Sequence, residues 1–173
     1  MPGDDRQTIF QGRYFALVAD PIHAEFVRCG DEALVVALTD EGEVILTIEP
    51  SAAFQEPTVI LPGGATRPGM TPAEIAEVAD HELQEEVGFR AGRLDYLGEL
   101  RPFSKYLTVR TFTYLARDLA PSTLAGDETY EIGVERVPLS SFESLIAAGR
   151  LLDARVIAAL YLARAFLASE ATA

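Results

Sequence analysis

Residues 61–89 read LPGGATRPGMTPAEIAEVADHELQEEVGF, and this stretch governs how the rest of the chain is interpreted. It runs from an apolar segment through a glycine loop into a helix. Thr71 is a hydroxyl N-cap, a proline follows at the first helical position, and Glu74 completes a capping box. No residue breaks the helix before Gly88, which is suited to end it. The stretch therefore predicts a helix over residues 72–87 directly after a glycine turn.

Three glutamates near the end of this helix occupy unusual positions. At about 100° per residue, Glu82 and Glu86 fall inside the apolar arc of the helix, one turn apart, and Glu85 lies at its edge. Ionised carboxylates that face inward are costly unless positive charge accompanies them. Because residues three and four apart share a helical face, the three carboxylates can converge on one hard cation. A solvated acidic helix is the alternative. The glycine turn favours a site, since it lets backbone carbonyls approach a metal or phosphate closely.

Together these residues resemble the signature box of the Nudix hydrolases. The resemblance rests on Leu-Pro-Gly-Gly at 61–64, Pro-Gly at 68–69 and Glu-Leu-x-Glu-Glu-x-Gly-Phe at 82–89. Residues 98–167 are loosely similar to the branch that hydrolyses ADP-ribose and related ADP compounds. The resemblance implies an α/β fold, a Nudix-type α/β/α sandwich with a mixed β-sheet, formed by a single Nudix hydrolase domain over residues 1–173.

Two positions depart from the box, and the helix carries three more residues than the pattern has between them. Met70 stands where the box has a glutamate, and His81 stands where it has an arginine. In the family these two residues are expected to form a supporting ion pair. Here both charges are missing together, so that neither is left without its partner. Glu77 and Glu85 share a helical stripe with His81, which offers a substitute pair.

Length, composition and charge restrict the remaining choices. The chain has 173 residues, of which 49% are hydrophobic, enough for one ordinary domain with a core. The net charge of −13 argues against nucleic acid or an anionic membrane as a partner, and an anionic substrate would need divalent cations. The single cysteine, Cys29, excludes an internal disulfide and favours the cytoplasm. Arg155 and Arg164 interrupt the apolar C-terminal run, so no membrane span is expected.

Hydrophobic patterning predicts the other elements. Strands are expected in an N-terminal pair within 13–28 and over residues 32–39, 43–48, 58–61, 94–100, 106–115 and 131–137. Two later helices are expected over residues 141–148 and 153–168. The polar residues 1–11 are expected to form a loose N-terminal tail. Strands, one helix, further strands and then helices around one core indicate an α/β sandwich.

The resemblance assigns the metal ligands. It implies magnesium, with manganese as an alternative, held by the carbonyl of Gly63 and by Glu82 and Glu86, with Glu85 joining or bridging. Carboxylate-held magnesium can clamp a diphosphate and activate a water molecule for attack on phosphorus.

A general base is also required, and it is expected outside the metal-bound glutamates because metal binding lowers their basicity. After the box, residues 126–131 read Gly-Asp-Glu-Thr-Tyr-Glu and form an acidic cluster on a glycine-bearing loop that includes Asp127. Glu128 is the first candidate for the catalytic base and Glu131 the second. If neither serves, Glu85 is the next candidate.

Substrate contacts are expected from basic and aromatic residues outside the box, namely Arg110, Arg101, Lys105, Tyr106 and Phe54. Arg110 matches a basic position in similar sequences and can meet a phosphate, whereas Phe54 can stack on a base. A surface strand arginine and a buried loop aromatic are the alternatives for these two. Similar ADP-ribose enzymes place an arginine where this chain has Ile48 or Glu49, which brings the contact to the terminal ribose or phosphate into question.

The leading hypothesis is magnesium-dependent hydrolysis of a nucleoside diphosphate linked to another moiety, ADP-ribose or a related ADP-sugar, to AMP and a sugar phosphate. One alternative is a hydrolase of nucleoside triphosphates or of dinucleotides such as NADH and diadenosine polyphosphates. Another is a non-catalytic Nudix-shaped nucleotide-binding module, which the changes at Met70 and His81 favour and the intact glutamates oppose. A homodimer is expected, because similar ADP-sugar hydrolases pair through N-terminal strands and residues 14–27 offer exposed β-edges.

Overall fold

A mixed β-sheet separates two helical layers in the computed structural model, which describes residues 6–21, 24–126 and 128–172. The strands of this sheet are β4 (Glu32–Leu38), β5 (Glu43–Ser51), β6 (Glu56–Ile60), β7 (Gly63–Ala65), β8 (Phe89–Leu100), β9 (Thr111–Pro121) and β10 (Gly133–Pro138). Their main order is β10-β5-β4-β9-β8, with β6 paired to β5 and β7 paired to β4. The sheet is mixed because β4 and β9 run parallel, while β4 with β5 and β8 with β9 run antiparallel.

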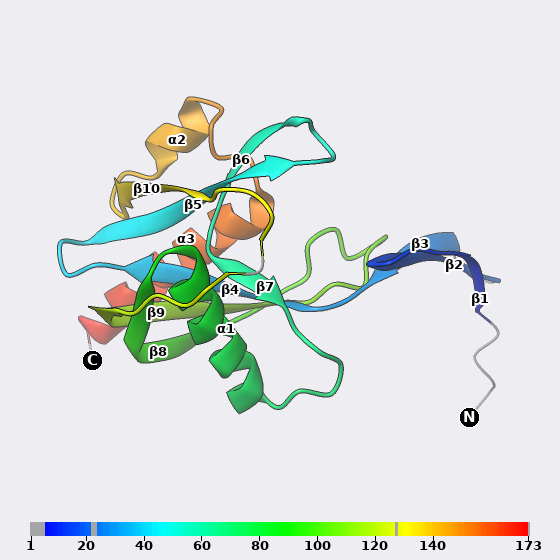
Figure 1. Ribbon diagram of the computed structural model, residues 1–173, viewed down its shortest axis with the longest axis horizontal. Coiled ribbons are helices and arrows are strands. Elements are labelled where there is room, and N and C mark those ends of the chain that lie inside the picture. The colour runs from blue at the N-terminus through cyan, green and yellow to red at the C-terminus, as the bar shows by residue number, and fades with distance from the viewer. Residues whose placement is uncertain (1–5, 22–23, 127, 173) are drawn as a thin grey trace.

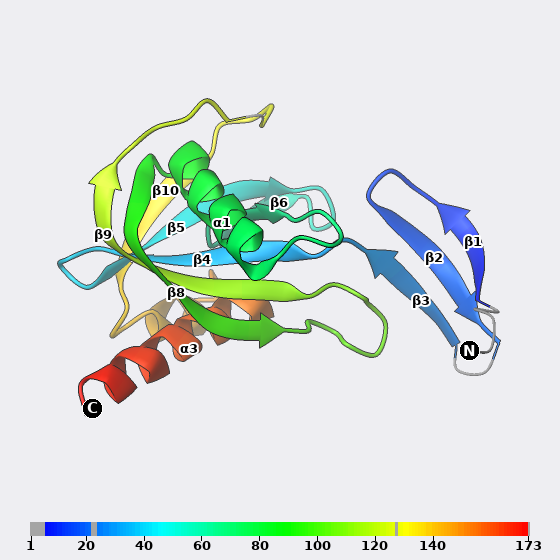
Figure 2. The ribbon, with the colours of Figure 1, turned by 90° about the horizontal axis from the view of Figure 1, so that it is seen from below.

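The predicted box helix, α1 (Pro72–Glu86), lies on one face of the sheet, and α3 (Ala154–Glu170) lies on the opposite face (Figure 2). The short helix α2 (Glu143–Ala147) precedes α3.

The capping box is present as predicted. The backbone N–H of Glu74 donates to Thr71 Oγ1, and Thr71 N–H donates to the Glu74 carboxylate at 2.7 Å. Gly88, with φ of 76°, follows the C-cap in the left-handed region that favours glycine.

Two apolar layers hold this arrangement together, and β4 contributes to both. Leu34 and Val36 pack in the layer that contains α3, whereas Val35 packs in the layer that contains α1. Alternate side chains of a strand point to opposite faces, so a strand buried on both sides is apolar throughout. The α/β/α sandwich with a mixed sheet is therefore confirmed.

A second sheet stands apart from this body at the N-terminal end of the chain (Figures 1 and 2). Its antiparallel strands are β1 (Gln7–Gln11), β2 (Phe15–Asp20) and β3 (Ala24–Cys29). The connection between β8 and β9 attaches this sheet to the body. Val27 N–H donates to the Tyr106 carbonyl at 2.7 Å, and Thr108 N–H donates to the Val27 carbonyl at 3.1 Å.

Several boundaries differ from the predicted ones because of pairing between distant segments. The expected loose tail is wrong for residues 7–11, which form β1 against β2, while residues 1–5 lie outside the described residues. The strand expected over residues 106–115 begins at Thr111, since the residues before it bond to β3 instead. At its other end β9 continues through Pro121, because β8 pairs with it from Phe89 onward. Residues 122–132 then connect β9 to β10 past the end of α1.

Candidate active site

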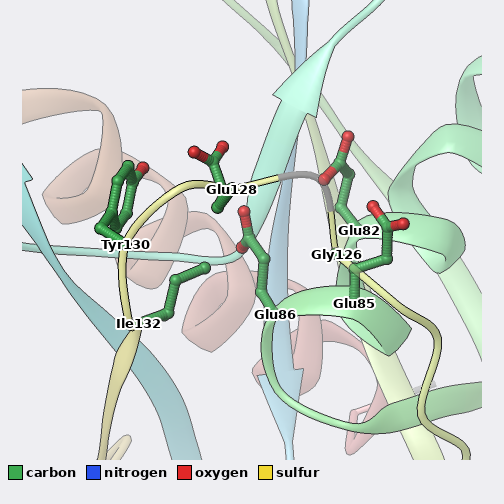
Figure 3. A pocket seen from close by; sticks show the side chains of 7 residues that line it. All are labelled: Glu82, Glu85, Glu86, Gly126, Glu128, Tyr130 and Ile132. Atoms are coloured by element: carbon green, nitrogen blue, oxygen red, sulfur yellow. The ribbon is translucent and has the colours of Figure 1, made fainter.

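A pocket of about 300 Å³ lies between the C-terminal half of α1 and the connection from β9 to β10 (Figure 3). Its lining residues are Glu82, Glu85, Glu86, Gly126, Glu128, Tyr130 and Ile132. The three helix glutamates meet there, as their spacing predicted. Glu128 approaches them from the opposite wall, while its neighbour Asp127 lies outside the described residues. As far as the described residues show, no lysine or arginine lines this pocket, so its charge is strongly negative.

The glycine pair of the box allows β7 to pass between β4 and α1. A Cβ atom on Gly63 would lie 2.3 Å from the carbonyl oxygen of Ala33, a distance that no neighbouring backbone tolerates. A Cβ atom on Gly64 would lie 1.9 Å from Glu82 Oε1 and would push that carboxylate away. Gly63 N–H also donates to Glu86 Oε2 at 3.1 Å. The two glycines therefore place the sheet backbone directly against the glutamates, because neither carries a side chain.

Glu86 shows the electrostatic cost of this arrangement most clearly. Burial raises its pKa to about 8, with further contributions from the negative charges of Glu49, Glu82 and Glu128, and the Gly63 N–H opposes the rise. Without a compensating cation, Glu86 thus retains a proton near neutral pH. Glu82, Glu85 and Glu128 line the same pocket, so a positive charge would relieve the repulsion among these carboxylates.

The oxygen atoms of the pocket suit a hard divalent cation such as magnesium, which prefers carboxylate and carbonyl ligands. Glu82, Glu85 and Glu86 would hold it, next to the backbone of Gly63. Among the described residues, no three acidic, thiol or imidazole side chains already stand in the geometry of a metal site.

The two departures from the box have local explanations. His81 Nδ1 lies 3.4 Å from Glu85 Oε2, so His81 forms the substitute pair with one of the glutamates on its stripe. Met70 packs against the apolar layer under α1, and its sulfur accepts a hydrogen bond from Arg67 N–H at 3.2 Å. Neither residue leaves an unpartnered charge beside the pocket.

The connection that carries Glu128 is anchored at both ends. At the first end, Ser122 Oγ donates to Gln84 Oε1 at 2.7 Å, and Leu124 N–H donates to the Gln84 carbonyl at 3.3 Å. At the second end, the Tyr130 hydroxyl donates to Glu49 Oε2 at 2.9 Å. The sequence alone assigned no role to Tyr130. It indicated Glu49 only as one of two positions where similar enzymes have an arginine. The one available signal was a tyrosine inside the acidic cluster.

The other predicted site residues lie elsewhere. Glu128 lines the pocket, whereas Glu131 is exposed and does not line it. Phe54 is 76% exposed at the tip between β5 and β6, so it is not a buried loop aromatic. Arg110 is half-exposed, and its Nε lies 3.0 Å from Asp31 Oδ2.

The predicted substrate contacts in the loop between β8 and β9 also do not line the carboxylate pocket. Arg101 Nε donates to Glu99 Oε1 at 2.6 Å. Lys105 and Tyr106 line a different cavity, of about 420 Å³, which they share with Phe26 of the N-terminal sheet. Within one chain, the structure therefore brings together Glu82, Glu85, Glu86 and Glu128, but neither Glu131 nor the predicted substrate contacts line the same pocket.

The sandwich, the glycine loop and the helix carboxylates together define the class of protein. The chain belongs to the Nudix family, whose NUDIX domain matches residues 30–160. This confirms the family predicted from the box, and the chain is a Nudix pyrophosphohydrolase that acts on small nucleotide substrates. Nudix hydrolases generally use divalent metal ions. The three-stranded N-terminal sheet lies outside the matched residues.

Two known proteins and one solved structure are similar to most of this chain. The chain is 30% identical over 139 residues to the ADP compounds hydrolase NudE of Escherichia coli (strain K12), which covers 80% of this chain and 73% of the relative. It is 25% identical over 167 residues to the methanol dehydrogenase activator of Bacillus methanolicus, covering 90% of this chain and 89% of the relative. A crystal structure of an ADP compounds hydrolase superposes with a TM-score of 0.84 at 26% identity, covering 96% and 93% of the two chains.

No helix in the described ranges has the length and apolar character needed to cross a membrane.

The raised pKa of Glu86 predicts how stability depends on pH in metal-free protein. The folded state holds a proton up to about pH 8, whereas the ordinary pKa is 4.5, so the folded state binds more protons between these values. Stability is therefore lost as pH rises through this window, and it is lowest above the folded-state pKa. Glu86→Gln removes the titration and keeps an acceptor for Gly63. We expect the variant to gain roughly 1 kcal/mol or more at pH 8.5, about 2–4 °C in Tm, and little at pH 4.5.

Thermal unfolding in a chelator at the two pH values measures this gain. Glu77→Gln is the control, because Glu77 is exposed on the same helix. A Glu86→Gln variant no more stable than wild type at pH 8.5 would contradict the assigned repulsion.

Proposed function

We propose that the protein hydrolyses a nucleoside diphosphate linked to another moiety, ADP-ribose or a related ADP-sugar, to AMP and a sugar phosphate, with magnesium as cofactor and manganese as an alternative. The observation that carries the proposal is the meeting of Glu82, Glu85, Glu86 and Glu128 in one pocket beside the glycine loop. A relative at 30% identity and a solved structure at 26% identity are each described as an ADP compounds hydrolase, which supports the substrate class.

The charge of the pocket explains why a cation is needed. A diphosphate is anionic, and the lining residues are acidic or uncharged in the described part of the chain. A divalent cation supplies charge that neutralises the diphosphate and acidifies a water molecule. Glu82, Glu85 and Glu86 would hold this cation from one wall of the pocket. They are thereby less basic, so the proton of the attacking water goes to a different group.

Glu128 is the proposed acceptor of that proton. It lies on the opposite wall from α1, on the connection between β9 and β10 (Figure 3). In the proposed reaction, the water oxygen bonds to one phosphorus and Glu128 takes its proton. The bond between that phosphorus and the bridging oxygen breaks, and the second phosphate leaves with the bridging oxygen.

A substrate panel tests the function. With magnesium present, we expect turnover of ADP-ribose or another ADP-sugar to exceed turnover of NADH, diadenosine polyphosphates and nucleoside triphosphates. Chelation should abolish it, and Glu82→Gln should reduce it by several powers of ten, about the scale of losing a catalytic metal ligand. Circular dichroism should show an unchanged fold. Faster turnover of a dinucleotide or triphosphate would support the second hydrolase reading, and binding without turnover would support a nucleotide-binding module.

The base assignment has its own matched pair of variants. We expect Glu128→Gln to lower kcat by roughly two to four powers of ten, the usual scale for removing a general base, with little change in substrate or metal affinity. Glu131→Gln should do much less, because Glu131 is exposed and does not line the pocket. The reverse order would place the base on Glu131. If both variants kept the full rate, the base would be Glu85, or the metal alone would activate the water molecule.

A homodimer is the proposed assembly. Phe10 and Phe15 of the N-terminal sheet, and Tyr14 in the turn between β1 and β2, are each at least half-exposed, and such aromatic surface is commonly covered by a partner. Light scattering at micromolar concentration should give twice the chain mass, and Phe10→Glu should shift it towards the monomer. Phe54→Glu is the control, because Phe54 is more exposed but lies on the β5–β6 tip. A monomeric mass for the wild type would reject the dimer.

A further inference from the structure

The described part of the connection between β9 and β10 borders the pocket as a strap, meaning here residues 122–126 and 128–132. Gln84 of α1 anchors its first end through Ser122 and Leu124. At the second end, backbone pairing of β10 with β5 begins only at Gly133, opposite Ile48. Before that point, the Tyr130 side chain makes the attachment by donating to Glu49. Glu128 lies between the two anchors, two residues from Tyr130.

Glu49 is itself held in position to receive this bond. Its Oε1 accepts a hydrogen bond at 2.9 Å from the hydroxyl of Thr47, which is fully buried in β5. Its Oε2 accepts from the Tyr130 hydroxyl at 2.9 Å. A residue and the one two positions further along a strand share a face, which is why the buried threonine can orient the carboxylate. Glu49 is thus a preset acceptor on β5, one residue beyond the pairing with β10, although no basic residue pairs with it in the described contacts.

We propose that Tyr130, held by Glu49, is a positioning residue that keeps Glu128 facing the helix carboxylates across the pocket. The inference rests on the proposed role of Glu128 as the base.

Repulsion between Glu128 and the helix glutamates explains why the hydrogen bond between Tyr130 and Glu49 matters. The helix glutamates repel Glu128, and Glu128 in turn contributes to the raised pKa of Glu86. A carboxylate on an exposed strap would move away from such a pocket unless a neutral donor restrained the chain beside it. Burial, followed by the hydrogen bond to Glu49, raises the pKa of Tyr130 above its ordinary value, with Glu128 contributing as well. The phenol therefore remains a protonated donor next to both carboxylates.

The segments on either side of this bond have attachments of their own. The adjoining strand β10 is attached to β5 by its own backbone ladder from Gly133 to Pro138, and the far end of the strap is attached to α1. Removal of the Tyr130 hydroxyl should consequently loosen residues near Glu128 without unfolding the sheet. A positioning role and a structural role thus predict different outcomes.

Tyr130→Phe, in the full-length protein with magnesium, tests the proposal on the fastest substrate of the panel. We expect kcat to fall roughly tenfold, as for loss of one hydrogen bond to a charged group, with KM within about twofold. Glu49→Ala should give a similar loss. Tyr96→Phe is the control, because Tyr96 is a half-exposed tyrosine on β8 outside this pocket. Unchanged kcat in Tyr130→Phe would overturn the proposal.

The double variant Glu128→Gln/Tyr130→Phe distinguishes positioning from a general structural effect. If Tyr130 acts through Glu128, adding Tyr130→Phe to Glu128→Gln should lower kcat no further. An undiminished tenfold loss in that background would reject action through Glu128. If Glu128→Gln alone keeps full rate, both the base and the positioning role are rejected. If it loses rate while Tyr130→Phe does not, only the positioning role is rejected.

Hydrogen exchange supplies a readout that needs no substrate. We expect Tyr130→Phe to speed amide exchange in peptides from residues 124–132 and to leave peptides from α1 unchanged. Unchanged exchange in the strap would overturn the proposal even if no substrate of the panel were hydrolysed.

Discussion

The close passage of the Gly63–Gly64 backbone between β4 and α1 is the constraint on which the rest of the site depends. Any side chain at Gly63 would meet the backbone of Ala33, and one at Gly64 would meet Glu82. Because both residues are bare, the helix can approach the sheet closely enough to bury its apolar stripe. The same approach brings its inward glutamates against the backbone of β7, where Gly63 bonds to Glu86.

This arrangement separates the source of stability from the source of chemistry. The apolar layers on both faces of β4 hold the sandwich together, whereas the pocket gathers carboxylates that repel one another. Glu86 carries that repulsion as a raised pKa. A site of this kind is costly without a cation and is relieved by one, so metal affinity and the local cost to the fold are linked. The strap then adds another carboxylate, Glu128. The anchors at Gln84 and Tyr130 hold it near the helix glutamates that repel it.

The predicted substrate contacts and the proposed catalytic groups lie in different parts of the chain. The basic and aromatic residues expected to contact a nucleotide lie outside the carboxylate pocket of their own chain. Lys105 and Tyr106 border the N-terminal sheet, and Arg110 is paired with Asp31. The N-terminal sheet joins the body through residues 106–108, so the position of that loop is coupled to the sheet. In the proposed reaction, the carboxylate pocket would therefore recognise a diphosphate through its cation rather than a particular sugar.

The sequence by itself determined the features that depend on neighbouring residues. The capping box at Thr71, the shared face of Glu82 and Glu86, and the glycine approach all follow from local geometry, since helical periodicity and the absence of a Cβ are properties of a short segment. Glu128 could also be singled out, because few acidic clusters follow the box. Tertiary structure alone decided the contacts between distant segments. Tyr130 meets Glu49 across 81 positions, and Arg110 meets Asp31 across 79. Residues 106–108 pair with β3 rather than extending β9 for the same reason: a segment that can form a strand has several edges available, and the choice among them depends on the packing of the whole chain.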